Sequence, residues 1–318
     1  MSGKFSPLDP KALRQVGLHQ RRSLVSREDF GRAWTPGGSL TDFLGSLPKI
    51  LAGRDLRDAA LALANARRAG KTVTWATGAH LVKTGLAPVL ASLMEAGVIS
   101  LLAVNGAVLI HDVEIALCGR TSEDVAAGLA DGSYGVTRET AEFLSGAARR
   151  AARGNLGLGE AVGREIQAAA PPFAGESLLA AAFRLGVPVT VHVALGTDVW
   201  HIAPGFDAAA AAGASHRDFL LFAGAVATLS GGVHVNSGSA VILPEVFLKA
   251  LTLARNLGRA VAGFTAVNLD FSHQYRPAQN VTGRPVSEGG RGISLVGSHE
   301  ILIPLLAAAV LEELRANP

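Results

Sequence analysis

The stretch that decides the fold runs from residue 72 to residue 116 and reads TVTWATGAHLVKTGLAPVLASLMEAGVISLLAVNGAVLIHDVEIA. An apolar run over 72–77 ends at a glycine, a helical pattern follows over about 86–96, and a second apolar run over 99–104 ends at Asn105. Two buried strands joined by a crossover helix form a right-handed βαβ unit, and ligands bind beyond the carboxyl ends of its strands. Because the polar residues of the stretch lie at or just after those ends, the pattern predicts a nucleotide-type pocket there.

The same alternation of strands and helices continues to the C-terminus. Strand-like segments cover 187–194, 231–235, 260–269 and 293–296, and helical patterns cover 177–185, 215–229, 244–257 and the chain from 298 onward. We count about five parallel strands, which predicts an α/β fold with a doubly wound, Rossmann-like, mostly parallel sheet. Residues 39–318 are expected to form this single domain, whereas residues 1–38 lack clean periodicity and form an N-terminal arm that packs on the body or on a neighbouring subunit.

Composition narrows the class of protein. The chain has 318 residues, 49% hydrophobic and 17% charged, with a net charge of +3 and no basic block, so we expect no nucleic-acid partner. The single cysteine, Cys118, excludes an internal disulfide and favours a reducing compartment, and its apolar helical neighbours predict a buried position. No stretch has a signal-peptide pattern or the roughly 18 apolar residues that span a membrane, so we expect a cytoplasmic protein without a membrane partner.

The loop after the first predicted strand carries candidate groups for binding an anion. Ala79, His80 and Lys83 lie between two glycines, ahead of a helix whose free N–H groups and positive dipole end favour an anion. The spacing matches neither a P-loop nor a GxGxxG fingerprint. The alternative is an ordinary glycine-rich βα turn with a solvated lysine.

The loop after the second predicted strand carries candidate groups for proton transfer. Asn105-Gly106-Ala107 lead into a helix on which His111 and Asp112 could act as a proton carrier and its orienting group. The alternative is a simple helix cap. His111 and Glu114 have a spacing compatible with a metal site, but no third ligand stands nearby, so we predict no metal.

Two further loops contribute candidate ligand contacts. Asp198 follows the third predicted strand, where a carboxylate could accept hydrogen bonds from ribose or amine groups. The segment around the fourth strand is rich in small residues that leave backbone groups free for a phosphate, and its candidates are Gly231, Gly232, Asn236 and Ser237. A plain turn is the alternative for both loops.

A long polar segment near the C-terminus crowds charged and polar residues together. Loops of such length inside a compact domain are usually functional or disordered. The candidates are Asn268, Asp270, Arg284, Glu288 and Arg291, followed by Ser298 and His299 at the start of the last helix. A solvated loop and a helix cap are the alternatives. Hydrolase functions rank low, because the chain has no GxSxG elbow and no paired-carboxylate pattern.

These loops resemble those of the deoxyhypusine synthase family. The similarity is carried by TVTWATGAHLVKTG (72–85), LMEAGVISLLAVNGAVLIHDVEIA (93–116), SGGVHVNSGSAVILPEVFLKALTLARNLG (230–258) and GRPVSEGGRGISLVGSHEILIPLL (283–306). The resemblance implies a doubly wound, NAD-binding fold and a homotetramer. It also implies NAD-dependent oxidation of an amine to an imine, which is then transferred to a lysine.

The resemblance further implies roles for individual residues. NAD would contact Ala79 to Lys83, Asn105 to Ala107, Asp198 on the ribose side, Gly231 and Gly232, with late contacts near Asn268, Ser298 and His299. The family's substrate histidine falls near Asn236 or Ser237.

The chain departs from the family pattern at two places. The family's catalytic lysine follows an Arg-Pro pair in a Trp-Gly-Lys context, whereas here Arg284-Pro285 is followed by VSEGGRGIS and Arg291 stands nearest. Arginine stays protonated and cannot form a covalent imine. The family's acidic pair is replaced by Ile110 and His111. The segment AVNGAVLIHDVEIAL (103–117) is more similar to the related NAD-dependent ornithine-cyclising enzymes, which need no such lysine.

Three functions are compatible with these features. The first is an NAD-binding enzyme that oxidises a small amine or amino acid to an imine, with His111 or Asp112 managing the amine proton. The second is true aminobutyl or alkylamine transfer with Lys83 in place of the missing lysine, and the third is a non-catalytic nucleotide-binding protein that kept the fold. For the first function, the expected substrate contacts are Glu288, Asp270 or Asp198 for the cation and Arg284 or Arg291 for a carboxylate.

Overall fold

The computed structural model describes residues 4–316, and its centre is a six-stranded parallel sheet. The strands lie in the order β3 (Val189–His192), β2 (Leu101–Asn105), β1 (Val73–Thr77), β4 (Val233–Ser237), β5 (Thr265–Asp270) and β6 (Arg291–Val296). The chain moves outward from β1 to β3 and then crosses back to β4, which pairs with the free side of β1. The order therefore reverses between β1 and β4, and the predicted doubly wound sheet is confirmed.

The central strands are apolar because helices cover both of their faces. All five residues of β1 are buried, as are the first four of β2. Side chains alternate between two cores: Trp75 packs in the larger cluster on one face, and Ala76 packs against the smaller cluster on the other. This two-sided burial explains why both strands read as continuous apolar runs in the sequence.

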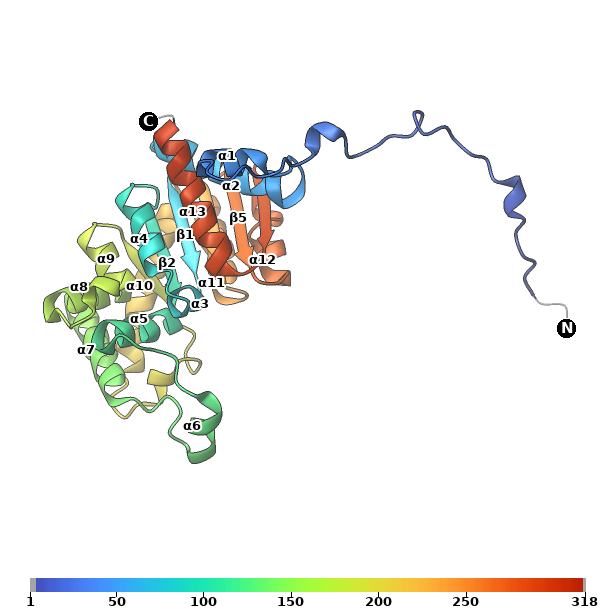
Figure 1. Ribbon diagram of the computed structural model, residues 1–318. Helices are drawn as coiled ribbons and strands as arrows, with labels where there is room; N and C mark the ends of the chain where they lie inside the picture. The colour runs from blue at the N-terminus through green and yellow to red at the C-terminus, as the bar shows by residue number, and fades with distance from the viewer. Residues whose placement is uncertain (1–3, 317–318) are drawn as a thin grey trace.

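Two sets of helices cover the sheet (Figure 1). One face carries α2 (Leu51–Arg68), α4 (Ala87–Glu95) and α13 (His299–Ala316), with α1 (Leu40–Ser46) packed on α13. The other face carries α10 (Ala208–Val226) and α11 (Ile242–Asn256), with α12 (Tyr275–Asn280) beside α11. No helix within residues 4–316 combines the length and the apolar character needed to cross a membrane.

A helical layer fills the long connection between β2 and β3 and flanks the sheet in Figure 1. Its members are α5 (Gly106–Cys118), α6 (Val125–Asp131), α7 (Arg138–Gly154), α8 (Leu158–Ala169) and α9 (Leu178–Arg184). The short α3 (His80–Lys83) follows β1 and contacts α5. These helices place α3 and the start of α5 at the carboxyl edge of the sheet.

The structure corrects several details of the sequence analysis. The sheet has six strands rather than about five, and the edge strand β6, which buries only alternate residues, begins at Arg291 instead of 293. Helix α8 lies in a glycine-rich segment where no helix was predicted, and α10 begins at Ala208 instead of 215. Cys118 is exposed, not buried, because α5 ends there and Gly119 turns the chain away with a φ of 67°.

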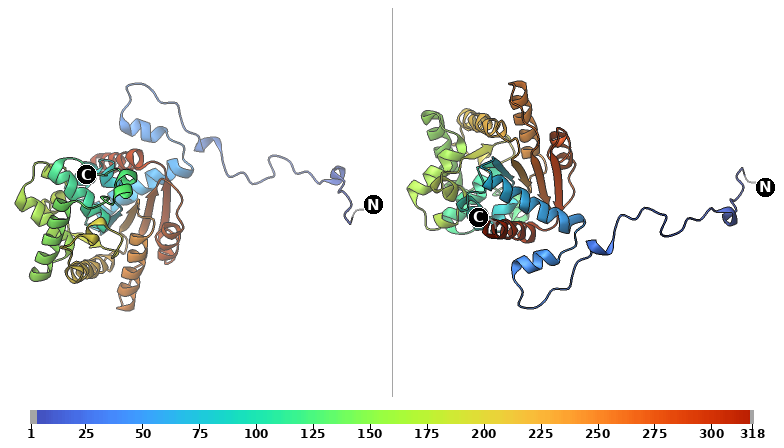
Figure 2. Two further views of the ribbon diagram at one scale, coloured as in Figure 1. Left: turned by 90° about the horizontal axis from the view of Figure 1, so that it is seen from below. Right: turned by 90° about the horizontal axis from the view of Figure 1, so that it is seen from above.

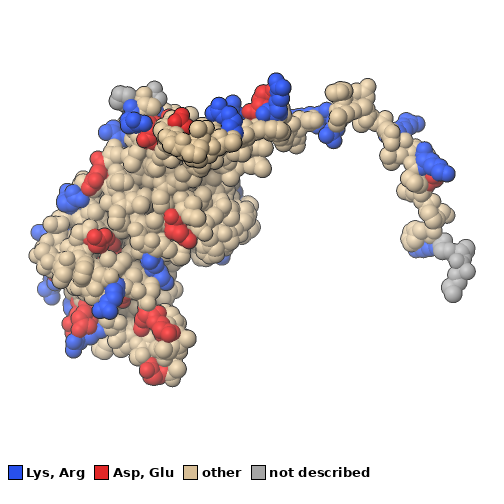
Figure 3. Space-filling model, in the orientation of Figure 1, with Lys and Arg blue, Asp and Glu red and all other residues tan. Residues whose placement is uncertain are grey.

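The N-terminal arm extends away from the body (Figures 1 and 2). Its described part, residues 4–38, is exposed almost throughout, and Lys and Arg side chains are spaced along it (Figure 3). The arm joins the body at α1, where Ser39 and Asp42 form a capping box. Just before this cap, the Trp34 ring meets the edge of Phe43 with centroids 5.7 Å apart. That the arm packs on a neighbouring subunit stays a prediction.

Candidate functional site

The carboxyl edge of the sheet brings together most of the residues that the sequence predicted. The loops after β1 and β4 are in close contact at the reversal point. The Gly78 N–H donates to the Ser237 carbonyl at 3.0 Å, and a Cβ on Gly78 would lie 2.3 Å from the Gly238 carbonyl oxygen. The predicted residues at or near this edge are Ala79, His80, Lys83, Asn105, Gly106, Ala107, His111, Asp198, Asn236, Ser237, Asn268, Asp270, Ser298 and His299.

His299 is the centre of a ring cluster over this edge. Its Nε2 lies 3.1 Å from the Leu269 carbonyl oxygen, which fixes the ring hydrogen on that nitrogen. The ring centroids of His80 and Phe271 lie 5.4 and 6.4 Å away. Gly238 makes room with a φ of +62°, since a Cβ there would lie 2.8 Å from His299 Cε1. The His299 Nδ1 is buried and has no partner in the described chain, so it is an available acceptor.

Two more buried acceptors lie at the ends of β4 and β5. Asn236 donates from Nδ2 to Asn268 Oδ1 at 2.7 Å, but its own Oδ1 has no partner within residues 4–316. Asp270 Oδ1 is equally unpaired in that range, although the residue is only 1% exposed. Buried polar groups are normally paired, so a cluster of exceptions indicates a place where a ligand, water or ion belongs.

Asp198 lies against the start of α5. A Cβ on Gly106 would be 1.8 Å from Asp198 Oδ2, so only glycine leaves room for the carboxylate there. His201 accepts from the backbone N–H groups of Gly196 and Asp198 through Nδ1, which leaves the hydrogen of the neutral ring on Nε2, 3.6 Å from Asp198 Oδ2. Burial raises the pKa of Asp198 to about 6. Asp198 Oδ2 has no hydrogen-bond partner among the residues described.

A cavity of about 150 Å³ opens beside Asp198. It lies between α3, α5 and the segments around Ser122–Tyr134 and Thr197–Val199. Its titratable lining groups are Lys83, His111, Glu114, Glu123, Tyr134 and Asp198. Three carboxylates face one lysine, so the cavity favours a cation when the carboxylates are ionised.

His111 takes part in a short chain of polar contacts at this cavity. Its Nδ1 lies 2.6 Å from Thr121 Oγ1, and the Thr121 hydroxyl donates to Glu114 Oε2. Burial, and secondarily the charge of Lys83, lower the pKa of His111 to about 4, so the ring is neutral near pH 7. Burial raises the pKa of Glu114. Over the described residues, no group of three His, Cys, Asp or Glu side chains converges as a metal site would require.

Asp112 has a different environment from its neighbour His111. Its carboxylate is fully buried and accepts from the Ser177 hydroxyl at 2.6 Å and from the backbone N–H groups of Leu178 and Leu179 at 2.7 and 3.2 Å. These donors form the start of α9, so Asp112 ties α5 to α9. Burial raises the pKa of Asp112 to about 6, although each of these hydrogen bonds lowers it. Because both oxygens accept hydrogen bonds from the start of α9, we assign Asp112 to the framework of the fold rather than to a substrate contact.

Two glycines that the resemblance assigned to NAD lie at the opposite edge of the sheet. Gly231 and Gly232 precede β4 instead of following it. A Cβ on Gly232 would lie 2.1 Å from the Thr72 carbonyl oxygen, so this glycine allows the starts of β1 and β4 to approach. The structure therefore does not bring them together with Asp198.

Three charged candidates also lie away from the carboxyl edge. Arg291 begins β6 and forms an ion pair with Asp58 of α2. Glu288 is exposed in the turn before β6, and Arg284 donates to Asn280 Oδ1 at 3.1 Å. A substrate at the carboxyl edge would not meet these three side chains.

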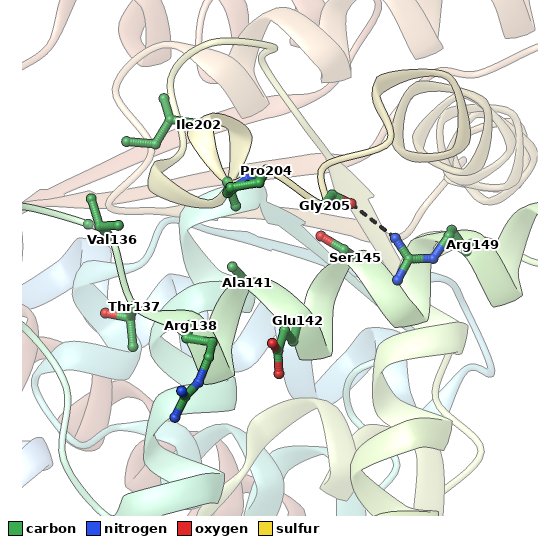
Figure 4. A pocket seen from close by; sticks show the side chains of 12 residues that line it. Val136, Thr137, Arg138, Ala141, Glu142, Ser145, Arg149, Ile202, Pro204 and Gly205 are labelled. Carbon is green, nitrogen blue, oxygen red and sulfur yellow. Dashed lines mark hydrogen bonds between the residues drawn. The ribbon is translucent and has the colours of Figure 1, made fainter.

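A larger cavity of about 400 Å³ lies between α7 and the loop at Ile202–Gly205 (Figure 4). Its walls are mostly apolar, and the Arg149 guanidinium donates to the Gly205 carbonyl at 3.0 Å beside it. None of the residues predicted from the sequence lines this cavity. We place the candidate site at the smaller cavity because the ionisable groups converge there.

Sequence reasoning missed the side of the cavity formed by residues 121–134. Thr121, Glu123 and Tyr134 line it or bond to its residues, whereas the sequence analysis assigned them no role in a site. Glu123 Oε1 accepts from the Gly135 N–H at 2.8 Å, which folds the segment back on itself. The sequence offers one indication of this side of the cavity, the polar run TSED (121–124), which follows a helix that ends at a glycine. The same run also fits a helix cap, and Asp124 does cap α6.

Comparison with known proteins identifies the fold. No model of a protein family matches the chain, and no curated protein sequence does. Among solved structures, a candidate deoxyhypusine synthase from Entamoeba histolytica matches with a TM-score of 0.51 and 10% identity over 89% of this chain and 96% of that one. AgrE in its ternary complex with ornithine and NAD+ matches with a TM-score of 0.52 and 13% identity over 84% of this chain and 34% of AgrE.

The cyanobacterial arginine dihydrolase ArgZ, from the ornithine-ammonia cycle, matches with a TM-score of 0.51 and 15% identity over 83% of this chain and 33% of ArgZ. The chain thus spans about one third of the length of AgrE and ArgZ. At identities this low the likeness concerns the fold alone. The chain has the deoxyhypusine synthase-like fold that its sequence motifs predicted.

Proposed function

We propose that this protein is an NAD-binding enzyme that oxidises a small amine or amino acid to an imine. The single observation that supports it most is the cavity beside the carboxyl edge, where the neutral His111 and the carboxylates of Glu114 and Asp198 face one space. The cavity lies beyond the carboxyl ends of β1, β2 and β3, on the same edge of the sheet as the reversal point between β1 and β4, where doubly wound folds bind dinucleotides. The ligands of the AgrE ternary complex, ornithine and NAD+, are an amino acid and this cofactor.

The groups at the edge are chemically suited to a dinucleotide. Ribose hydroxyls and an adenine amine are donors, and the edge offers the unpaired acceptors Asp198 Oδ2, Asp270 Oδ1 and His299 Nδ1. The close approach of Gly78 to Gly238 places backbone instead of side chains at the reversal point. When bound, NAD+ would supply the acceptor for a hydride from the carbon that carries the amine. The predicted contacts at Gly231 and Gly232 are left out of this proposal.

The residues of the cavity would handle the amine itself. Its carboxylates attract the ammonium group, and 150 Å³ is below the roughly 300–1,000 Å³ of pockets that enclose a whole drug-sized ligand, so only a small amine fits. The ammonium nitrogen loses one proton to neutral His111 as its carbon loses a hydride, which leaves a protonated imine. Lys83 is the one lysine or arginine of the cavity lining, so it replaces Arg284 and Arg291 as the proposed partner of a substrate carboxylate.

The place of Lys83 also supports a second candidate, alkylamine transfer. An imine formed in the cavity would lie beside the Lys83 amine, which would add to the imine carbon and displace the original nitrogen as ammonia or an amine. Borohydride reduction during turnover separates the two functions: a stable mass increase on Lys83 supports transfer, and an unmodified lysine supports simple oxidation.

The test of the proposal is a thermal-shift titration with NAD, applied to the parent, His111→Ala and Asp198→Ala. A ligand that binds only the folded state adds about 2.7 kcal/mol at a hundredfold excess over its dissociation constant. We expect a shift in the parent that Asp198→Ala reduces. His216→Ala, an exposed histidine on α10, is the matched control and should behave like the parent.

Co-purified NAD would mask such a shift, so the protein is first denatured and its supernatant assayed for dinucleotide. A panel of amines and amino acids is then screened for NADH absorbance and for amine loss. His111→Ala should keep NAD binding and lose amine oxidation. Absence of both a shift and bound dinucleotide in the parent would rule out the cofactor.

A further inference from the structure

Thr121 and Glu114 constrain the hydrogen positions around His111. Thr121 Oγ1 has one hydrogen, which it donates to Glu114 Oε2, since an ionised carboxylate only accepts. The same oxygen lies 2.6 Å from His111 Nδ1 and must therefore accept there. The ring hydrogen of neutral His111 is then on Nδ1, which leaves the lone pair on Nε2.

The geometry points to Glu114 and Thr121 as positioning residues that hold His111 in the Nδ1–H tautomer, so that Nε2 is the atom that takes the proton from the substrate ammonium group. This inference rests on the proposed function for the identity of the proton donor. It assigns a role to two side chains outside the residues predicted from the sequence.

The backbone around Thr121 supports a built arrangement. Gly119 and Ser122 both have left-handed conformations, with φ values of 67° and 68°. This region favours glycine, so Ser122 is a strained residue next to Thr121, and such strain is concentrated at functional sites. The two turns fold residues 119–122 back over the last turns of α5, which brings Thr121 to a side chain ten positions earlier.

The other charges around His111 fit the role of a proton acceptor. Lys83 of α3 lies on the same cavity, together with Glu123 and Tyr134 of the 121–134 segment and Asp198. Burial, and secondarily the charge of Lys83, lowers the pKa of His111 and keeps the free imidazole neutral, so a ring nitrogen is free of its second proton before the reaction. Once His111 Nε2 has taken the ammonium proton, the imidazolium is stabilised by the negative charge of Glu114 through Thr121, and the proton leaves His111 to solvent after the imine departs.

The test measures the tautomer directly and the reaction separately. Nitrogen NMR of the protein labelled with ¹⁵N-histidine, with the His111 signals assigned from His111→Gln, reports which ring nitrogen carries the hydrogen. The variants are Thr121→Val, which keeps the shape and loses the hydroxyl, and Glu114→Gln, which keeps the volume and loses the charge. Thr252→Val is the control, because Thr252 is an exposed threonine on α11.

We expect His111 in the parent to be in the Nδ1–H form and both variants to lose that preference. Oxidation of an amine identified by the screen should fall by about tenfold to a hundredfold in kcat for both variants, since general base catalysis contributes about 10²–10⁴-fold. NAD affinity should be unchanged in both, and KM should be unchanged in Thr121→Val, which keeps every carboxylate of the cavity. Thr252→Val should match the parent in both measurements.

The outcomes separate this inference from the proposed function. A parent His111 with its hydrogen on Nε2, or a tautomer and kcat unaffected in Thr121→Val, overturns the inference even where amines are oxidised. An Nδ1–H tautomer that both variants abolish, in a protein that oxidises no amine, supports the positioning role and removes the proposed substrate.

Discussion

Gly106→Ala is the most direct perturbation of the proposed cofactor site. The new Cβ would lie 1.8 Å from Asp198 Oδ2, and real contacts of this kind stay beyond 3.0 Å, so the oxygen must retreat by at least 1.2 Å. The carboxylate is buried, and the groups around it include the His201 ring, whose Nε2 is already 3.6 Å from Asp198 Oδ2. A displaced Asp198 can no longer meet a ribose hydroxyl at hydrogen-bond distance.

The expected cost is that of one hydrogen bond to a charged group. Such a bond contributes about 1.5–3 kcal/mol, which corresponds to a loss of about 10- to 150-fold in NAD affinity. Isothermal titration calorimetry of NAD against the parent and the variant measures it. The unfolding midpoint in urea is a second readout that does not depend on NAD.

Gly213→Ala on α10 is the matched control. A Cβ there would meet only the end of the Arg217 side chain, at 3.9 Å. Both glycines are helical, so relief of the helix penalty of glycine, about 1 kcal/mol in a helix interior, should stabilise Gly213→Ala and leave its NAD affinity unchanged. If Gly106→Ala bound NAD as tightly as the parent and gained the same stability, the reasoning on Asp198 would be wrong.

Three further predictions concern buried carboxylates. Asp112→Ala should lower the free energy of unfolding by about 2–4 kcal/mol, because the backbone N–H groups at the start of α9 lose their acceptor. NAD affinity should be retained. Urea unfolding measures the stability, and calorimetry measures the NAD affinity. Burial raises the pKa of Asp198 to about 6, so NAD affinity should fall as the pH drops below 6 in the parent and stay flat in Asp198→Asn. Asp218 lies on α10, and burial raises the pKa of its carboxyl to about 7. The raised pKa contributes stability to the folded state that is full below about pH 4. This contribution, up to about 4 kcal/mol, is lost as the pH rises through 7. Urea midpoints at pH 5 and 8 should differ more in the parent than in Asp218→Asn.

The part of the fold that the sequence predicted well is the part with a local signal. The runs at β1 and β2 are apolar on both faces, and each ends in polar residues where the sheet meets solvent. That pattern predicted both strands and the edge at which Asn105 and Lys83 lie. The edge strand β6 lacks it, because one face is exposed and its residues alternate.

The misplaced residues show which information the sequence lacks. The run GGVHV (231–235) was interpreted as one strand-like unit, but β4 begins only at Val233. Gly232, just before the strand, allows the backbone to approach the Thr72 carbonyl closely. The sequence alone does not distinguish a glycine that is needed for close packing from a glycine that is needed for binding a phosphate. Glu288 lies in the turn before β6 and Arg291 is the first residue of that strand, so both lie where the chain enters the strand rather than where it leaves it. Only the path of the chain decides the edge of the sheet at which they lie.

The contacts of Thr121 were beyond sequence reasoning for another reason. They depend on the backward turn at Gly119 and Ser122, which brings residues ten apart together without any periodic pattern. Polar clusters formed by such turns have no spacing rule, so they are found only when hydrogen-bond partners are assigned atom by atom.

Asp112 and Asp198 show why burial alone does not identify a functional carboxylate. Both follow strands closely in sequence, both are buried, and burial raises the pKa of each to about 6. They differ in what their oxygens contact: both oxygens of Asp112 are bonded to the start of α9, whereas Asp198 Oδ2 has no partner in residues 4–316. The desolvation cost of Asp112 is offset by bonds inside the fold, while that of Asp198 is left for a ligand to offset. The unpaired oxygen, more than the shifted pKa, is therefore the reason to assign Asp198 to the cofactor and Asp112 to the framework.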